Sequence, residues 1–236
     1  MATPMALGEN KVSSLPRVEG KHLTRGKILD NGANATVFKG SLLYKGCSIK
    51  VAIKVPYFPD INKIENEAKV LHEVQGAGGA PILFGITREE PYSLVMTYCP
   101  GHTLGHYLLN HSTDDCLHAF VNLYTAVEEL HSRGFSHNDL HSNNIILHKN
   151  SSDVKIHIID MGHAKLLLRD STDEGTTLDY KTLLIHANEI VQLLDNSSKY
   201  EALKRQVQGA SHTFEGVRGI VEIMKTVLAA ACPKER

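Results

Sequence analysis

A single lysine stands in a run of residues that is otherwise apolar. Residues 51–55 read Val-Ala-Ile-Lys-Val, and the lysine is Lys54. Such a lysine either faces solvent on an edge strand or is a buried ammonium ion held for an anionic group such as phosphate. A buried ammonium ion also needs a carboxylate partner, because an unpaired buried charge costs several kcal/mol.

The segment that follows Lys54 offers such a partner. Its apolar side chains recur at spacings of three and four residues, which predicts a helix. At 100° per residue the apolar stripe is centred between Ile64 and Leu71, and Glu67 lies about 50° from that centre, whereas Glu65 lies about 110° away. We therefore expect Glu67 to face inward and pair with Lys54.

Two carboxylates and one amide form a second constellation. Asp139 and Asn144 lie in residues 136–144, which read Ser-His-Asn-Asp-Leu-His-Ser-Asn-Asn, and Asp160 opens the triplet Asp-Met-Gly. A magnesium-nucleotide site needs hard oxygen ligands for the metal and an acceptor for a hydroxyl proton. Turns rich in Asn and Asp also cap their own backbone, but both turns together, downstream of the lysine and its glutamate, favour the chemical interpretation.

The elements that must position these residues fall into a β-rich part and a helical part. The predicted strands are 23–29, 36–43, 48–55, 82–87 and 92–97, and one helix interrupts them at 59–76. After a turn-rich joint at 98–101 we predict a helix that includes 117–130, strands at 144–147 and 154–159, and helices near 180–194 and 216–232. This pattern predicts an α+β fold of two lobes.

Domain boundaries follow from the same pattern. Residues 1–21 mix Pro, Gly, Ser and charged residues without a period, which is typical of a flexible leader. We expect a small β lobe with one helix at 22–98 and a larger, mainly helical lobe at 99–236.

Composition narrows the class of protein. The chain has 236 residues with 25 Lys and Arg against 26 Asp and Glu, so its formal net charge is −1, which argues against a nucleic-acid or membrane-surface partner. Cysteines 47, 99, 116 and 232 are far apart and form no Cys-x-x-Cys pair, which indicates a reducing compartment. There is no apolar segment of signal-peptide or membrane-spanning length. We expect a cytoplasmic protein.

Taken together, these motifs resemble those of a eukaryotic-type protein kinase domain over about residues 23–162, with a weaker continuation to residue 236. The resemblance implies the two-lobed kinase fold, with ATP and Mg²⁺ as cofactors. In the family's terms Lys54 is similar to the lysine that grips the α- and β-phosphates, and Glu67 to the glutamate that orients it. Asp139 resembles the catalytic base, and Asn144 and Asp160 resemble the magnesium ligands.

The resemblance also implies a nucleotide pocket. Residues 94–99 look like the hinge that hydrogen-bonds adenine through its backbone, and the gatekeeper position is taken by a methionine. The residues implied to bind the nucleotide are Gly32, Val37, Ala52, Lys54, Met96, Tyr98 and Cys99, of which Val37 and Ala52 would enclose the base.

Several positions depart from the family pattern. Asp30 and Ala35 replace two glycines of the glycine-rich loop, so only Gly32 remains. Asn138 stands where the family usually has the arginine that clamps a phosphate on the activation segment. His141 replaces the lysine of serine/threonine kinases and is closer to the arrangement in small-molecule kinases of the aminoglycoside type. It is either a catalytic hydrogen-bond donor or a solvated loop residue.

The segment after residue 162 departs furthest. It has no Ala-Pro-Glu motif, and Asp179 is the best candidate for the buried aspartate that the family carries on the following helix. The tail at 232–236 resembles the stretch whose arginine normally pairs with the missing glutamate. We therefore expect a shortened platform for a peptide substrate.

Three functions remain open at this point. The first is an ATP- and magnesium-dependent phosphotransferase acting on Ser/Thr or Tyr hydroxyls of proteins, with Lys54, Glu67, Asp139 and His141 as its catalytic residues. The second is a pseudokinase-like binding module with weak or no catalysis, and the third is a small-molecule kinase. A more remote reading takes His137 and Asp139 as part of an iron site. The sequence identifies no protein substrate or binding partner.

Overall fold

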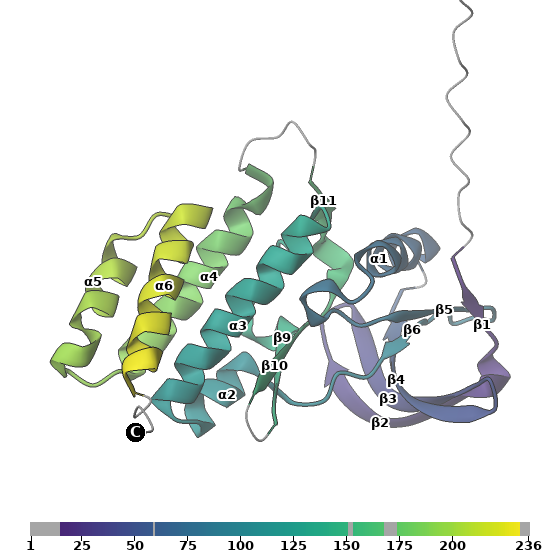
Figure 1. Ribbon diagram of the computed structural model, residues 1–236. Coiled ribbons are helices and arrows are strands. Elements are labelled where there is room, and N and C mark those ends of the chain that lie inside the picture. The colour runs from purple at the N-terminus through teal and green to yellow at the C-terminus, as the bar shows by residue number, and fades with distance from the viewer. Residues whose placement is uncertain (1–14, 59, 151–152, 168–173, 232–236) are drawn as a thin grey trace, which may run out of the picture.

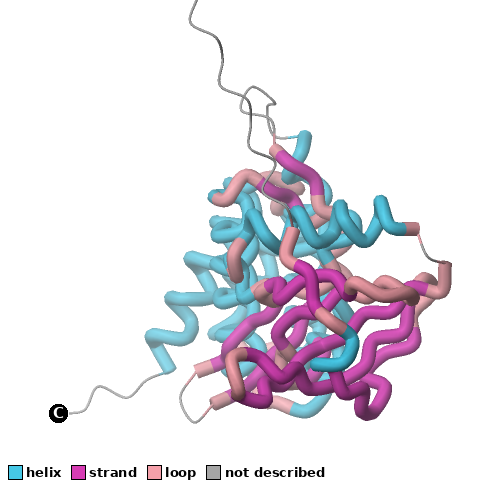
Figure 2. Tube along the Cα trace, turned by 90° about the vertical axis from the view of Figure 1, so that its right-hand side faces the viewer, coloured by secondary structure: helices cyan, strands magenta, loops and turns pink. Residues whose placement is uncertain are grey.

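The small lobe is built on a six-stranded sheet in the computed structural model, which describes residues 15–58, 60–150, 153–167 and 174–231. The strand order is β1-β5-β6-β4-β3-β2, and all pairings are antiparallel except that of β1 with β5. Figure 1 shows this sheet at one end of the molecule, and Figure 2 shows its strands grouped apart from most helices. The strands are β1 (Arg17–Val18), β2 (Leu23–Asn31), β3 (Ala35–Tyr44), β4 (Cys47–Pro56), β5 (Leu83–Thr87) and β6 (Leu94–Thr97).

The β3–β4 hairpin brings Lys54 to the middle of the sheet. Its two-residue turn consists of Lys45 and Gly46, and both have positive φ angles, 49° and 80°. Turns of this kind have a twist that matches the flanking strands. Lys54 lies opposite Val37 of β3 and Leu94 of β6, so the lysine is on a central strand and not on an edge.

Helix α1 (Ile61–Val74) follows β4. It begins after Asp60, whose carboxylate accepts hydrogen bonds from the N–H groups of Asn62 and Lys63. Its C-terminal cap is Gln75, which has a φ of 50°. Such caps satisfy backbone groups that the helix itself leaves unpaired. Its buried residues are Ile64, Glu67, Ala68, Leu71 and Val74.

The loop after α1 contains a short 3₁₀ turn, η2 (Ala77–Gly79). Gly78 and Gly79 have φ angles of 63° and 67°, a region that favours glycine. A Cβ atom on Gly79 would overlap the carbonyl oxygen of Ile156. The backbone of this loop therefore packs directly on strand β10 (Val154–Ile158) of the large lobe.

The large lobe consists of five helices and two small sheets within the described residues (Figure 1). Helix α3 runs through its core, with Leu117, Phe120, Val127 and Leu130 almost fully buried, and it packs against α4, α6 and β10. The helices are α2 (Leu104–Asn110), α3 (Thr113–Ser132), α4 (Glu174–Leu193), α5 (Glu201–Gly209) and α6 (Phe214–Ala231). The sheets contain β7 (His102–Thr103), β9 (Ile145–Lys149) and β10, and β8 (Phe135–Ser136) with β11 (Lys165–Leu166).

Short 3₁₀ turns complete the described elements. They are η1 (Gly20–His22), η3 (Ser142–Asn144), η4 (Met161–His163) and η5 (Ser198–Tyr200). Two of them position predicted site residues: η3 ends at Asn144, and Asp160 is the residue directly before η4.

The α+β fold of two lobes is confirmed, with differences at several elements. Ordered structure begins before the expected boundary at residue 22, because Arg17–Val18 pairs with β5 and η1 follows it. Helices α2 and α5 were not predicted, since each is short and buries few side chains. Helix α4 begins at Glu174, earlier than expected. The tail at 232–236 lies outside the described residues, and no described helix has the length and apolar character needed to span a membrane.

Candidate active site

Three charged side chains meet where the small lobe faces the large lobe. The Nζ atom of Lys54 lies 2.9 Å from both carboxylate oxygens of Glu67 and 2.8 Å from Oδ1 of Asp160. Glu67 comes from α1, while Asp160 follows β10 in the other lobe. The pairing of Lys54 with Glu67, expected from the helical period, is present in the structure, and Asp160 is a second partner.

Burial and charge compete in this cluster. Burial disfavours the charged form of Lys54, but the Glu67 and Asp160 carboxylates outweigh it and raise the pKa of the lysine. Burial also works against the Asp160 carboxylate, yet the charge and hydrogen bond of Lys54 hold its pKa below the ordinary value. Burial, together with the Asp160 charge, raises the pKa of Glu67, which is only 8% exposed, and Lys54 opposes this shift.

A backbone turn with positive φ directs Asp160 toward the lysine. Asp160 has a φ of 63°, and its Oδ1 accepts a hydrogen bond from the N–H of Gly162. The next residue, Met161, is buried in the hydrophobic core. The buried methionine anchors the triplet, so that the aspartate before it projects toward Lys54.

Asp139 and Asn144 contact each other in the loop between β8 and β9. The Nδ2 atom of Asn144 donates to the backbone carbonyl of Asp139 at 2.9 Å and to its Oδ2 at 3.1 Å. Because the amide nitrogen donates to these two oxygens of Asp139, the amide oxygen of Asn144 points away from them. The structure thus brings these two predicted residues together.

His141 also lies beside Asp139. Its Nδ1 accepts a hydrogen bond from the N–H of Asn143, and its Nε2 lies 3.5 Å from Oδ2 of Asp139. The side chain of His141 is half exposed. This position places a hydrogen-bond donor next to the carboxylate, while the ring keeps its contact with solvent.

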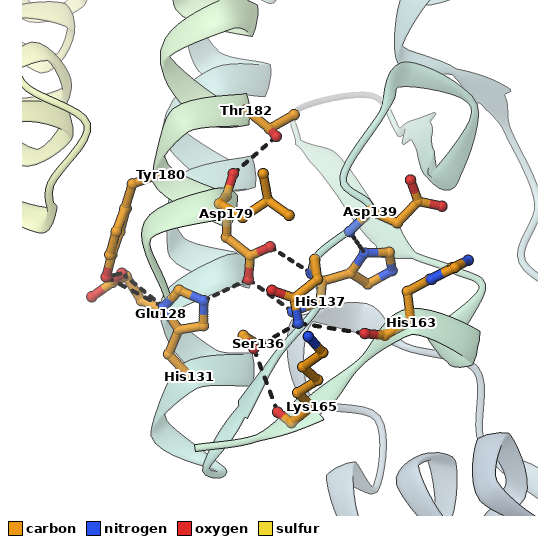
Figure 3. Close-up of polar contacts among 12 residues, drawn as sticks. Glu128, His131, Ser136, His137, Asp139, His163, Lys165, Asp179, Tyr180 and Thr182 are labelled. Carbon is orange, nitrogen blue, oxygen red and sulfur yellow. Dashed lines mark hydrogen bonds and ion pairs between the residues drawn. The ribbon is translucent and has the colours of Figure 1, made fainter. Parts of the chain in front are cut away.

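The backbone around Asp139 is held by a buried aspartate on α4 (Figure 3). Asp179 accepts hydrogen bonds from the N–H groups of His137 at 2.8 Å and Asn138 at 2.7 Å. Its Oδ2 also lies 2.9 Å from Nε2 of His131, at the end of α3. Asp179 is completely buried, so the expected buried aspartate is found at this position.

His137 is engaged by the backbone on both sides of its ring. Its Nε2 donates to the carbonyl of Ile159 at 2.9 Å, and its Nδ1 accepts from the N–H of Asp139 at 3.2 Å. Burial lowers the pKa of His137 and favours the neutral ring. Neither nitrogen is free for a metal, and the described residues contain no group of three or more His, Cys, Asp or Glu side chains able to hold one. The interpretation of His137 and Asp139 as part of an iron site is therefore wrong.

The side chains predicted to enclose a nucleotide base come from neighbouring strands. Ala52 of β4 lies opposite Met96 of β6, and both are buried, whereas Val37 of β3 is partly buried. Tyr98 and Cys99 follow β6 and are also partly buried. Burial raises the pKa of the Cys99 thiol to about 11.

The loop between β2 and β3 keeps one glycine of the expected pattern. The N–H of Gly32 donates to the carbonyl of Ala35 at 3.1 Å, which closes the turn. An Oδ2 atom of Asp30 lies 3.5 Å from the place that a Cβ atom on Gly32 would take. The Asp30 carboxylate therefore lies beside Gly32 in this loop.

A sequence model of the protein kinase domain matches residues 23–203. The chain belongs to the protein kinase family. The match begins at β2 and ends within α5, so it includes the Lys54 cluster, the Asp139 loop and Asp179. It therefore supports a kinase, that is, a transferase, and confirms the resemblance seen in the separate motifs.

The chain is similar to several curated kinases. It is 29% identical over 171 residues to the serine/threonine-protein kinase unc-51 of Caenorhabditis elegans, and the aligned region covers 65% of this chain and 20% of that protein. It is 29% identical over 157 residues to human serine/threonine-protein kinase ULK1, covering 61% of this chain and 15% of ULK1. With the casein kinase I homolog RAG8 of Kluyveromyces lactis it shares 21% identity over 204 residues, covering 84% of this chain and 38% of RAG8. The chain thus spans less than two fifths of each relative.

Sequence reasoning did not identify His131 as part of the site. The ring is nearly buried between Asp179 and the hydroxyl of Tyr180, which itself donates to Glu128. The signal available was its position directly after Leu130, on the edge of the apolar face of α3. That signal predicts burial and does not reveal which carboxylate the histidine contacts.

Proposed function

We propose that this chain is an ATP- and magnesium-dependent kinase that transfers phosphate to serine or threonine hydroxyls of proteins. The observation that carries the proposal is the cluster of Lys54, Glu67 and Asp160. In it the Nζ atom of Lys54 lies within 2.9 Å of carboxylate oxygens from both lobes. The names of the relatives unc-51 and ULK1 support serine and threonine as the residues phosphorylated.

The side chains fit a magnesium-nucleotide complex. Asp160 supplies a carboxylate and Asn144 an amide oxygen, and Mg²⁺ in nucleotide sites commonly takes only one or two protein ligands in addition to phosphate oxygens and water. Lys54, fixed by Glu67, supplies the positive charge for phosphate oxygens. Bound Mg²⁺-ATP would supply the phosphoryl group, with the metal neutralising its charge.

The residues of the Asp139 loop would handle the proton of the substrate. Asp139 would accept the hydroxyl proton while Asn144 holds one of its carboxylate oxygens and its backbone carbonyl. His141 would donate a hydrogen bond near the transferred phosphate. Positioning and charge stabilisation account for most of this chemistry. The contacts of Lys54 with Glu67 and Asp160, and of Asn144 with Asp139, support this assignment of roles.

Thermal unfolding with and without ATP and MgCl₂ tests nucleotide binding. At about 100 times the dissociation constant, a ligand stabilises the native state by roughly 2.7 kcal/mol, which raises the Tm of a domain of this size by about 5–10 °C. We expect this shift in the wild type and its loss in Lys54→Met. A wild type that shows no shift at millimolar Mg²⁺-ATP contradicts nucleotide binding.

Transfer of labelled phosphate tests catalysis and substrate class. Asp139→Asn should keep the thermal shift but lose transfer by about 10²-fold or more, because it removes the proton acceptor and leaves the phosphate contacts intact. Peptides with Ser, Thr or Tyr should be compared with hydroxylated amines. Transfer to the amines alone would favour a small-molecule kinase.

One observation favours a second candidate, a pseudokinase-like binding module. Asp30 places a carboxylate beside Gly32, in the loop that would cover the phosphates, and a negative charge near a phosphate weakens nucleotide binding. The same two experiments separate the candidates, because a binding module shows a small thermal shift or none and transfers no phosphate.

A further inference from the structure

Helix α4 contacts the Asp139 loop at a second point, which the site described above does not include. The Nε2 atom of His186 lies 2.9 Å from the backbone carbonyl oxygen of Leu140, and its Nδ1 lies 2.9 Å from Oε2 of Glu189. His186 is only 3% exposed, while the Glu189 side chain is half exposed. The histidine is therefore buried between the Asp139 loop, which connects β8 and β9, and a carboxylate at the surface.

The contact between His186 and Leu140 has a defined direction. A carbonyl oxygen can only accept, so the Nε2 atom of His186 donates to the carbonyl of Leu140. The Glu189 carboxylate lies at the other ring nitrogen, so the ring is bound on both sides. The Leu140 carbonyl is therefore held by a buried donor.

Two residues of α4 bind the backbone on either side of Asp139 in the sequence. Asp179 binds the N–H groups of His137 and Asn138, and His186 binds the carbonyl of Leu140. The two α4 residues are separated by about two helical turns, which puts them on the same face of the helix. The backbone before Asp139 is thus held through its donors, and the backbone after it through an acceptor.

We propose that His186 is a positioning residue for Asp139, and this inference rests on the proposed kinase function. By fixing the carbonyl of Leu140, His186 limits rotation of the peptide unit between Leu140 and His141, one residue after Asp139. This limit sets the direction of the Asp139 carboxylate toward a substrate hydroxyl. A misplacement of about 1 Å in a catalytic group can reduce a rate about 100-fold.

The test compares two variants in the full chain. His186→Leu removes the bond to Leu140 and keeps the site apolar and filled. Asn122→Leu is the matched control, because the Asn122 amide also donates to a backbone carbonyl, that of Val154, at 2.8 Å. Val154 is the first residue of β10, at the end of that strand away from Asp160. Activity and hydrogen exchange are measured well below the Tm of each variant.

We expect kcat to fall about 10- to 100-fold in His186→Leu, with KM for ATP within twofold of the wild type. Hydrogen exchange should increase in residues 137–144 and not in α3 or α6. The Asn122→Leu variant should show neither effect. His186→Gln, whose amide can still donate to the Leu140 carbonyl, should recover part of the lost kcat.

Three results would overturn the proposal. These are an unchanged kcat in His186→Leu, equally faster exchange throughout the large lobe, or the same kcat loss in the Asn122→Leu control. If the wild type transfers no phosphate, the proposed function fails, and hydrogen exchange alone then decides the positioning role. Local loosening of 137–144 in His186→Leu would support that role, and unchanged exchange would refute it.

Discussion

Lys54 compensates two carboxylates at once, and one of them is almost completely buried. Without the lysine, Glu67 has no cation within the cluster and its neutral form is favoured further. We therefore expect Lys54→Met to destabilise the protein by about 2–4 kcal/mol at pH 8. The cost should be smaller at pH 5, because a carboxyl group whose pKa is raised in the folded state loses stability as the pH rises above its unfolded pKa of about 4.3.

Urea unfolding of Lys54→Met at both pH values measures this effect. The double variant Lys54→Met with Glu67→Gln is the control, because an amide does not titrate and its unfolding free energy should lack the added pH dependence. Equal losses at pH 5 and pH 8 in the single variant would show that Glu67 does not carry the penalty.

Asp30 is the residue that departs most clearly from what a phosphate site requires. If its carboxylate lies about 6 Å from a phosphate charge, the repulsion is about 3 kcal/mol at an effective dielectric of 20, before screening by salt. We expect Asp30→Gly to lower KM for ATP about 3- to 10-fold and to leave kcat within twofold.

The control for this prediction is Glu201→Gln on α5. It removes an exposed carboxylate far from this loop (Figure 1) and should leave KM unchanged. A KM unaffected by Asp30→Gly would place the carboxylate outside the phosphate site.

At the scale of elements, the loop between α1 and β5 depends on glycine for two separate reasons. Gly79 has a positive φ, and a side chain there would overlap the backbone of β10. Gly46, in the β3–β4 turn, also has a positive φ but has open space around it. We expect Gly46→Ala to cost about 1–2 kcal/mol through its backbone angle alone, and Gly79→Ala to cost at least twice as much. Thermal unfolding of both variants measures the difference, and equal costs would mean that the overlap is relieved without strain.

The elements that sequence reasoning found are those with a clear period or strong local signals. The 3.6-residue period of α1 selected Glu67 over Glu65, and the structure confirms that Glu67 contacts Lys54. Helix α5 was missed because it buries only Leu203 and Val207. A pattern that short is compatible with a loop or a strand as well as with a helix.

The contacts that orient Asp139 could be predicted only in part. Asp179 was expected to be buried because of the family resemblance, but its bonds to the backbone join residues more than 40 positions apart. His186 lies in the middle of an apolar helix face, where the sequence alone indicates an ordinary buried position. Such long-range polar contacts depend on the packing of whole helices, which local periodicity does not describe.

For the molecule as a whole, polar contacts join the two lobes at two places. The Lys54 bond to Asp160 joins the sheet of the small lobe to the residues that follow β10. In the loop after α1, the carbonyl of Gly79 lies 2.9 Å from the Nδ1 of His157 on β10; a carbonyl can only accept, so the nitrogen donates. One contact is made by β10 and the other by a residue just after it, so this segment of the large lobe is bound to the small lobe at two points.

The second of these contacts makes the stability of the whole molecule depend on pH. His157 is buried, and its Nε2 has no hydrogen-bond partner among the described residues. Burial lowers the pKa of His157 below its ordinary value despite the bond to Gly79. The neutral ring is therefore the form that fits the folded protein, because a second proton would be buried without an acceptor.

We expect the free energy of unfolding to decrease as the pH falls below about 6.5, the ordinary pKa of histidine. Below that pH the unfolded chain binds a proton at His157 that the native protein resists, so stability is lost until the pH reaches the lowered native pKa. The contribution of His157 is at most about 1.4 kcal/mol per pH unit.

His157→Asn keeps a donor for the Gly79 carbonyl and removes the titration, so its unfolding free energy should fall less steeply between pH 7 and pH 5. His118→Asn, at an exposed position on α3, serves as the control and should keep the wild-type slope. If the His157→Asn slope equals that of the wild type, acid destabilisation arises elsewhere in the molecule.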